Sequence, residues 1–348
     1  MRILRNNLSW SFAMALTFAL AGTTAAQDQG TTKLAQTGMK FLEVGANARQ
    51  TALGDAFTAG EGNSVSMFYN TAGMARLSST FDMSVGQTQW LADIRHLYAT
   101  VAWNLQDIGV FGVAAQYIDY GDIQQTILVD KSINNQGFLD VGTFKPWGAV
   151  IGVGYARALS DKFSVGGNIK WVKQDLGESY TNVVSFSSVN SDSNTTQKNT
   201  QSVYAFDFGV LYKTGIKSLA FGVAVRNFSR EVTFQKESFQ LPLTFKMGVA
   251  MNVLDIAEMD PASQSLMIAI DAEHPRDYQE QIRIGAEYLF ANTVAIRLGY
   301  VTPADDFNAS YGIGVQQDWM GTHMALDYSY TPYRTFDAVS RISLRFGF

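Results

Sequence analysis

Apolar and polar residues alternate along the last ten positions of this chain. One side of an extended strand there carries large apolar residues, and the other side carries arginine, serine and glycine. The apolar residues are Ile342, Leu344, Phe346 and Phe348, and the others are Arg341, Ser343, Arg345 and Gly347. Such a strand fits the wall of a membrane barrel, with lipid outside and polar packing inside. A soluble β-sandwich also contains such strands, so the interpretation depends on repetition.

The same two-residue period recurs in about fourteen segments, and an even number of strands is typical of bacterial outer-membrane barrels. The segments are 81–87, 97–104, 109–117, 149–157, 163–173, 204–212, 219–228, 243–253, 266–273, 282–289, 294–301, 309–315, 324–330 and 339–348. We therefore predict an all-β fold, namely a transmembrane outer-membrane β-barrel of about 14 antiparallel strands in the cell outer membrane.

The connections between these segments also favour a barrel. Those after even-numbered segments are mostly short and polar, as at 105–108 and 290–293, whereas two after odd-numbered segments, 118–148 and 174–203, are long. Outer-membrane barrels place short turns in the periplasm and long loops outside. All six prolines lie between the segments or at their ends, where a missing N–H breaks no hydrogen-bond ladder.

The amino terminus predicts export from the cytoplasm. Two early arginines precede an apolar stretch at 10–20 that is too short to span a bilayer, and small residues follow it. Beyond this stretch, no apolar run reaches the roughly 18 residues that a membrane helix requires. We predict three parts, which are a signal peptide at 1–26, an amino-terminal extension with a lumenal plug at 27–78, and the transmembrane barrel at 79–348.

Composition narrows the classes of function. A net charge of −5 shows no global basic surface, which argues against nucleic acid as a partner. No coenzyme-binding or phosphate-binding loop occurs, so we expect no cofactor. Catalytic parts are scarce, because the chain has no Cys, only three histidines (His96, His274 and His323), and no serine in a nucleophile-elbow context. We therefore expect no catalytic residue, no metal site and no enzyme activity.

Charged residues fall on the inward side of the later predicted strands. If Ile284 faces lipid, then Glu287 faces inward, and the same alternation turns Arg297, Asp327 and Arg345 inward. Glu287 and Arg297 are nearly opposite across a short turn, so they can form a cross-strand ion pair. We interpret these charges as an ionic lattice that stiffens the lumen, and a selectivity filter is the alternative.

The stretch 38–77 lacks the period of a strand. Small residues dominate it, and apolar residues recur at three- and four-residue spacing around Arg49, which predicts short helices and tight turns. Such a segment fits inside a barrel as a plug. Its marked positions are Gly45, Arg49, Gly54, Asp55, Asn70 and Gly73. We expect Arg49 to clamp wall carboxylates such as Asp271 or Asp327, and orienting a ligand carboxylate is the alternative.

Three stretches carry a resemblance to a known family, namely 41–57, Asn70-Thr71-Ala72-Gly73 and 89–94. Together they resemble the PorV/PorQ family of outer-membrane proteins, which is related to the FadL barrels of fourteen strands with an amino-terminal hatch. Thr71 stands where family members usually carry proline. That change removes a fixed φ but keeps the turn residues on either side. The resemblance covers roughly the first third of the chain.

The resemblance implies one of two functions. PorV-like members serve type IX secretion by receiving cargo with a carboxy-terminal signal domain, whereas FadL-like members admit hydrophobic small molecules. We predict a non-catalytic component of type IX protein secretion that binds secreted cargo or the translocon, with FadL-like transport of hydrophobic small molecules as the alternative. The expected partners are outer-membrane lipid together with cargo, translocon or a hydrophobic solute.

Two loop regions bear on that choice. Trp90 and Asp93 form a candidate partner-binding rim, although Trp90 equally suits the aromatic belt of a membrane barrel. The long loop 118–148 also carries apolar residues, which form either a greasy access groove or the loop's own small core. These residues are Ile123, Ile127, Leu128, Val129 and Ile133.

Overall fold

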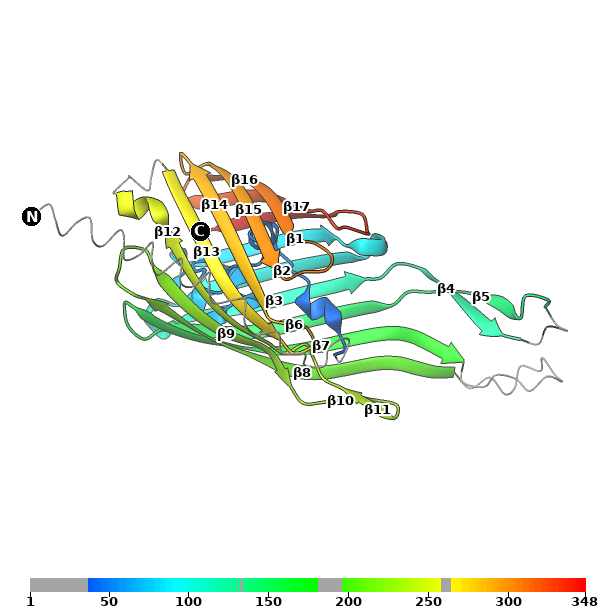
Figure 1. Ribbon diagram of the computed structural model, residues 1–348. Coiled ribbons are helices and arrows are strands. Elements are labelled where there is room, and N and C mark those ends of the chain that lie inside the picture. Colours follow the sequence, from blue (N-terminus) through cyan, green and yellow to red (C-terminus); the bar gives the residue numbers. More distant parts are fainter. Residues whose placement is uncertain (1–36, 130, 132–133, 181–195, 258–263) are drawn as a thin grey trace, which may run out of the picture. The chain divides into compact units, whose positions relative to one another are not determined.

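A computed structural model describes residues 37–129, 131, 134–180, 196–257 and 264–348 (Figure 1). The chain divides into two units, residues 1–33 and 34–348, and the barrel belongs to the second. The predicted signal peptide at 1–26 and residues 27–36 of the predicted extension lie outside the described residues. Of the helices that are described, none is long and apolar enough to cross a bilayer.

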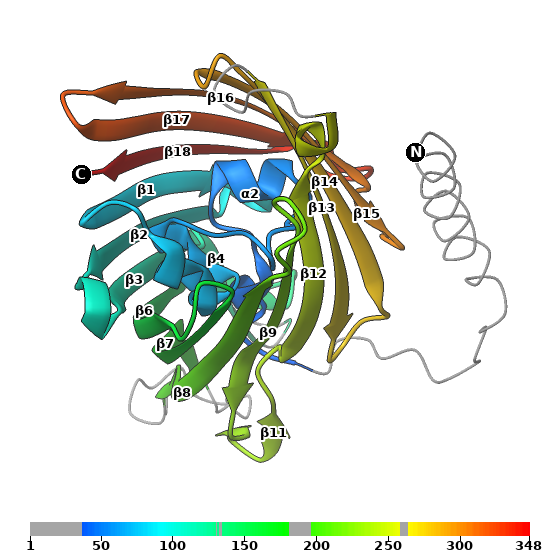
Figure 2. The ribbon, with the colours of Figure 1, turned by 90° about the vertical axis from the view of Figure 1, so that its left-hand side faces the viewer.

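Within the described ranges, fourteen antiparallel strands close into one barrel, which confirms the predicted fold class (Figure 2). They are β1 (Phe81–Gln89), β2 (Arg95–Asn104), β3 (Val110–Asp119), β6 (Trp147–Ala158), β7 (Phe163–Tyr180), β8 (Thr196–Lys213), β9 (Ala220–Ser229), β12 (Thr244–Asn252), β13 (Gln264–Pro275), β14 (Gln281–Phe290), β15 (Val294–Thr302), β16 (Ala309–Trp319), β17 (Thr322–Thr331) and β18 (Val339–Gly347). Each predicted segment coincides with one strand, and β7 and β8 extend further toward their connecting loop than predicted.

The two faces of the strands differ as a membrane wall requires. In β18, Ile342 and Leu344 are exposed on the outside, whereas Arg341 and Ser343 are buried. Lipid tails accommodate the apolar side chains, while polar groups must find partners inside the protein. The amino-acid alternation therefore sets which residues reach the lumen.

The carboxyl-terminal strand closes the barrel. β18 pairs with β1 in an antiparallel register from Asp82↔Gly347 to Gln89↔Ser340. Phe81 and Phe348 exchange two backbone hydrogen bonds of 2.7 and 2.9 Å at the end of this pairing. Closure leaves no unpaired backbone edge of the barrel facing lipid.

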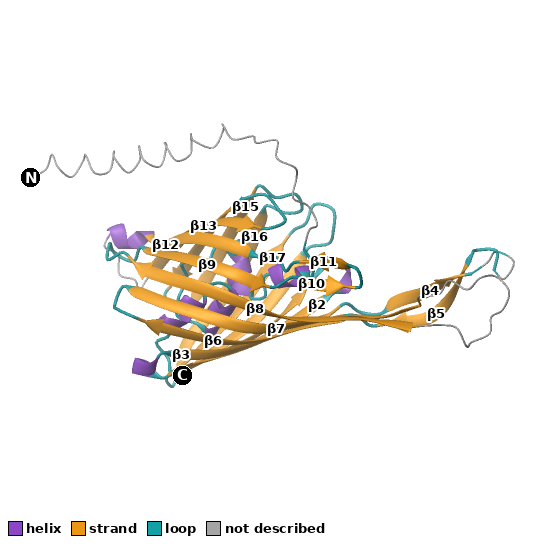
Figure 3. Cartoon of the chain, turned by 90° about the horizontal axis from the view of Figure 1, so that it is seen from below, coloured by secondary structure: helices purple, strands orange, loops and turns teal. Residues whose placement is uncertain are grey.

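Within the described residues, the longer connections carry two small hairpins that are not among the fourteen predicted segments. One pairs β4 (Ile123–Leu128) with β5 (Phe138–Phe144), and the other pairs β10 (Val232–Phe234) with β11 (Glu237–Phe239). Figure 3 shows β4 and β5 extending past the loop end of β2 and β3. Ile133 lies outside the described residues. The predicted groove or loop core therefore stays a prediction.

Short helices follow one another in residues 37–80, which we call the amino-terminal segment. They are η2 (Lys40–Glu43), α2 (Ala48–Ala52), η3 (Ser64–Phe68) and η4 (Thr71–Arg76), and single turns η5 (Leu91–Asp93), η6 (Gln106–Ile108) and η7 (Val253–Ala257) lie in the connections between strands. The segment lies within the ring of strands (Figure 2). The segment begins at the loop end of the barrel, where Thr37 pairs with Gln240 in a long loop. It ends at the opposite end, the end with the short turns, where the Asn104 amide donates a hydrogen bond to the carbonyl of Leu77.

Candidate functional site

The turn around Gly54 shows how the sequence shapes the amino-terminal segment. Asn47 caps α2 by accepting a hydrogen bond from the backbone N–H of Arg49 at 2.9 Å. Gly54 and Asp55 then take left-handed φ values of 66° and 61°. A Cβ at Gly54 would also lie 3.2 Å from the backbone nitrogen of Tyr300, so glycine allows the turn to approach the wall.

Arg49 joins this segment to the charged wall. Its guanidinium donates to both carboxylate oxygens of Glu287, at 2.8 and 2.6 Å. Glu287 also accepts from Arg297, which in turn donates to Asp327 at 2.8 Å. Burial lowers the pKa of Arg49, but the charge of Glu287 and its hydrogen bonds raise it above the usual value. The clamp partner is thus Glu287, not Asp271 or Asp327, which the sequence suggested as examples.

Wall arginines also hold backbone carbonyls of the amino-terminal segment. In the part of the chain that the structure describes, these bonds run from Arg226 to Leu42, from Arg341 to Gly45, from Arg283 to Gly54 and from Arg345 to Gly62, at 3.4, 3.1, 3.1 and 2.7 Å. A guanidinium satisfies a carbonyl that a buried, irregular backbone would otherwise leave unpaired. The segment is therefore fixed to the wall at intervals along its length.

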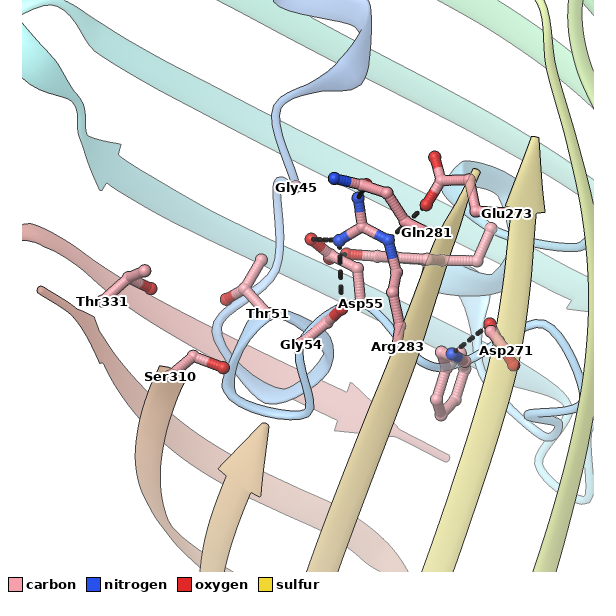
Figure 4. Close-up of polar contacts among 12 residues, drawn as sticks. Gly45, Thr51, Gly54, Asp55, Asp271, Glu273, Gln281, Arg283, Ser310 and Thr331 are labelled. Carbon is pink, nitrogen blue, oxygen red and sulfur yellow. Dashed lines mark hydrogen bonds and ion pairs between the residues drawn. The ribbon is translucent and has the colours of Figure 1, made fainter. Parts of the chain in front are cut away.

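Two wall carboxylates hold the segment through its N–H groups. Asp271 accepts from the backbone nitrogens of Phe57 and Thr58 at 3.0 and 2.9 Å, and from the Thr58 hydroxyl at 2.6 Å. Asp82 accepts from Ser64 N at 2.7 Å and from Arg345 at 2.7 Å. Arg345 is thus paired with Asp82 and does not join the Glu287, Arg297 and Asp327 chain. Figure 4 shows Arg283 reaching Gly54, with Asp271 bonded beside it.

Asn70 and Gly73 lie in the last helical turn of the segment. Asn70 caps η4 through Ala72 N at 3.1 Å, and its amide donates to the carbonyls of Thr58 and Val210 at 2.7 and 2.9 Å. A Cβ at Gly73 would lie 2.5 Å from the carbonyl oxygen of Gly60. These contacts hold the turn together with threonine at position 71.

Above the segment, at the loop end of the barrel, lies a cavity of about 820 Å³. Most charged residues of its lining form ion pairs. Lys40 pairs with Asp277 at 2.9 Å and Lys246 with Glu273 at 3.0 Å, and Arg283 also pairs with Glu273. Arg226 and Arg341 also line it, and no carboxylate among the described residues lies within 4 Å of either guanidinium. The cavity therefore combines balanced charges with two cations that lack an ion-pair partner.

The predicted rim residues occupy different places. Trp90 lines the cavity, packs edge-on against Tyr333 at 5.8 Å between ring centroids, and lies under the Arg341 guanidinium at 5.6 Å. Asp93 is exposed in η5, with a left-handed φ of 61°. Trp90 thus belongs to the wall of the cavity and Asp93 to the outer surface of the same loop, and partner binding at either stays a prediction.

Several residues of the site were not selected from sequence. Arg226, Arg283 and Arg341 hold the segment. Arg341 lies on the polar side of the last predicted strand, and Arg283 directly precedes the lipid-facing Ile284, so the same alternation turns both inward. This inward position is the sequence feature that indicates a contact with the contents of the lumen. Which carbonyl each reaches depends on the path of the amino-terminal segment, and no local pattern encodes that path.

Several solved structures, among them a toluene transporter, a monoaromatic hydrocarbon channel and a FadL homologue, have a fold similar to that of this chain. The toluene transporter TodX of Pseudomonas putida is 11% identical, with 85% of this chain and 96% of that chain covered and a TM-score of 0.54. The monoaromatic hydrocarbon channel CymD is 10% identical, with 87% and 96% covered and a TM-score of 0.54. A Pseudomonas aeruginosa FadL homologue is 11% identical, with 86% and 96% covered and a TM-score of 0.50. At such identities the likeness concerns the fold alone.

The sequence itself identifies the family. Residues 140–346, more than half of the 348-residue chain, match the family model described as type IX secretion system membrane protein PorP/SprF. No curated protein matches the chain significantly. The predicted outer-membrane location is confirmed by the barrel and this match, whereas the narrower PorV/PorQ assignment is not confirmed. The chain belongs to the PorP/SprF family of type IX secretion system membrane proteins.

Proposed function

We propose that this protein is a non-catalytic outer-membrane component of type IX protein secretion that binds secreted cargo or the translocon at the loop end of the barrel. The family match supports the secretion role. The observation that carries the binding role is the cavity of about 820 Å³, which is lined by charged and aromatic side chains. This mixed lining suits a polypeptide, since a protein interface needs aromatic anchors as well as polar partners.

Transport of hydrophobic small molecules is the second candidate. The FadL-like fold favours it, and solved structures with this fold include a protein named as a toluene transporter and one named as a monoaromatic hydrocarbon channel. The lining of the cavity opposes it, because Lys246, Glu273 and Arg283 face the same space. An apolar solute there would remove water from charged groups without replacing its hydrogen bonds. The charges therefore favour a polar partner.

A deletion strain complemented with variants tests the choice between these functions. We expect the deletion to reduce surface display and release of proteins with carboxy-terminal signal domains, and the wild-type gene to restore both. A combined Trp90→Ala and Asp93→Ala variant should restore them less well, because it alters the predicted rim. Lys162→Ala, in an exposed turn at the other end of the barrel, is the matched control and should restore secretion fully.

Two further measurements in these strains separate the alternatives. Purification of the tagged protein from native membrane should recover secreted cargo or a large translocon component. Uptake of labelled toluene should be equal in the deletion and wild-type strains. Normal secretion together with lost toluene uptake would instead establish the transport function.

A further inference from the structure

Arg341 is a buried cation at the edge of the cavity. Its side chain comes from the loop end of β18, and the residue is only 5% exposed. Nε donates to the carbonyl of Gly45 at 3.1 Å, and one terminal nitrogen donates to the Thr331 hydroxyl at 3.2 Å. Both acceptors are neutral. The positive charge is therefore held in place without being neutralised by a bonded anion.

Among the residues that the structure describes, no other charge around Arg341 supplies that anion. Asp55 is the acidic group whose charge acts on it most, but it lies beyond 4 Å and already accepts from the Tyr69 hydroxyl at 2.9 Å. Asp55 also faces Arg283, at 3.8 Å. Taking a guanidinium out of water costs several kcal/mol unless it is paired. An unpaired arginine that is nine-tenths buried and lines a cavity is thus arranged for an anion from outside the chain.

The surroundings of Arg341 favour a particular kind of anion. Trp90 and Tyr333 form an aromatic corner beside the guanidinium, and Phe307 packs on Tyr333 at 5.0 Å between ring centroids. Burial raises the pKa of Tyr333 to about 12, so its hydroxyl remains a donor at neutral pH. The planar fork of arginine matches a carboxylate. A multiply charged phosphate is disfavoured, because Asp55, Glu273, Asp305 and other carboxylates line the same cavity.

We propose that Arg341, Trp90 and Tyr333 form a carboxylate-binding subsite in the loop-side cavity, which takes a single carboxylate attached to an apolar or aromatic body. This inference deepens the proposed function and rests on it only for the source of the ligand, which would be the free carboxyl end of a polypeptide partner. A small organic carboxylate has the same chemistry and would fill the same subsite.

Calorimetry on the purified full-length protein in detergent tests the subsite. The probes are an N-acetylated tripeptide of alanine and phenylalanine with a free carboxyl end, its carboxamide, and propionate. The wild type should bind the free acid about tenfold to 100-fold more tightly than the carboxamide, the range expected for a hydrogen-bonded charge. Arg341→Gln should remove that preference. Arg95→Gln, an exposed arginine paired with Asp119 at 2.6 Å, should leave it unchanged.

Since Arg341 also holds Gly45, heat-modifiable gel mobility must first show that the variant is folded. Tyr333→Phe removes one donor without touching the segment and should weaken the preference for the acid several-fold. Equal binding of acid and carboxamide to the wild type, no binding of either, or a full preference in Arg341→Gln would overturn the proposal. Propionate binding as tightly as the peptide would support the subsite but assign it to a small carboxylate. Secretion in cells is a separate readout, so the two proposals can fail independently.

Discussion

Replacing Glu287 by glutamine should destabilise the barrel more than any ordinary change on its outer face. Glu287 accepts two hydrogen bonds from Arg49, at 2.8 and 2.6 Å, and a further one from Arg297. Glutamine has nearly the same shape but no charge, and its amide nitrogen cannot accept from a guanidinium. The variant therefore leaves two arginines facing a neutral group inside the lumen.

The expected loss can be estimated from these contacts. Breaking a buried ion pair by removing one partner costs about 3–5 kcal/mol of unfolding free energy. Two features place the effect at the lower end of that range. Arg297 keeps Asp327 at 2.8 Å, and the Arg49 side chain is 25% exposed, so water can solvate it. We predict a loss of about 3 kcal/mol, against about 0.5 kcal/mol for lipid-facing Ile284→Val.

Urea unfolding of the two variants and the wild type in micelles measures these losses. Pairing Glu287→Gln with Arg49→Met gives a double-mutant cycle that isolates the contact between the segment and the wall. The double variant should be less destabilised than the sum of the single variants. Equal unfolding midpoints for Glu287→Gln and Ile284→Val would refute the reasoning, because they would show that the ion pairs are solvated and dispensable.

Two further predictions concern the fit of the segment. Gly166→Leu should prevent normal assembly, since a Cβ there would lie 2.5 Å from the backbone nitrogen of Ala72. Gly167→Leu is the control and should assemble, because its Cβ would have no neighbour closer than 3.5 Å. Heat-modifiable gel mobility checks both variants, and similar mobility shifts would contradict the prediction. Burial raises the pKa of Asp277, but hydrogen bonds from Thr37 and Lys40 outweigh it and lower the pKa below 3.8. The stabilisation by Asp277 should therefore be present above pH 3.8 and lost as pH falls through the lowered pKa. Asp277→Asn should show a smaller loss of stability between pH 5 and pH 2 in urea unfolding, and an unchanged loss would argue against the contact.

The sequence predicts the wall of this barrel better than its contents. The two-residue alternation identifies all fourteen strands and turns Glu287 and Arg297 toward the lumen, because lipid and lumen impose opposite requirements on neighbouring side chains. The β10–β11 hairpin was missed because strands of three residues are too short to show a period. The alternation within one strand is a local property, so the strands of the wall can be identified directly from the sequence.

Contacts of the amino-terminal segment depend on residues distant in sequence. Arg49 and Glu287 are 238 positions apart, and nothing near either residue specifies the other. The cavity is likewise assembled from η2, several loops and the loop ends of the strands. Its existence follows from how far the segment fills the lumen, which the sequence pattern does not determine.

Site-specific photo-crosslinking in the native membrane tests the central claim most directly, which is that this barrel binds a secretion partner at its loop end. A crosslinking amino acid is placed at Asp93, on the exposed rim beside Trp90, and in a matched strain at Lys162, in an exposed turn at the opposite end. We predict that position 93 crosslinks to secreted cargo or a translocon component and that position 162 crosslinks to neither. Crosslinks to neither partner from position 93, in cells that secrete normally, would contradict the account.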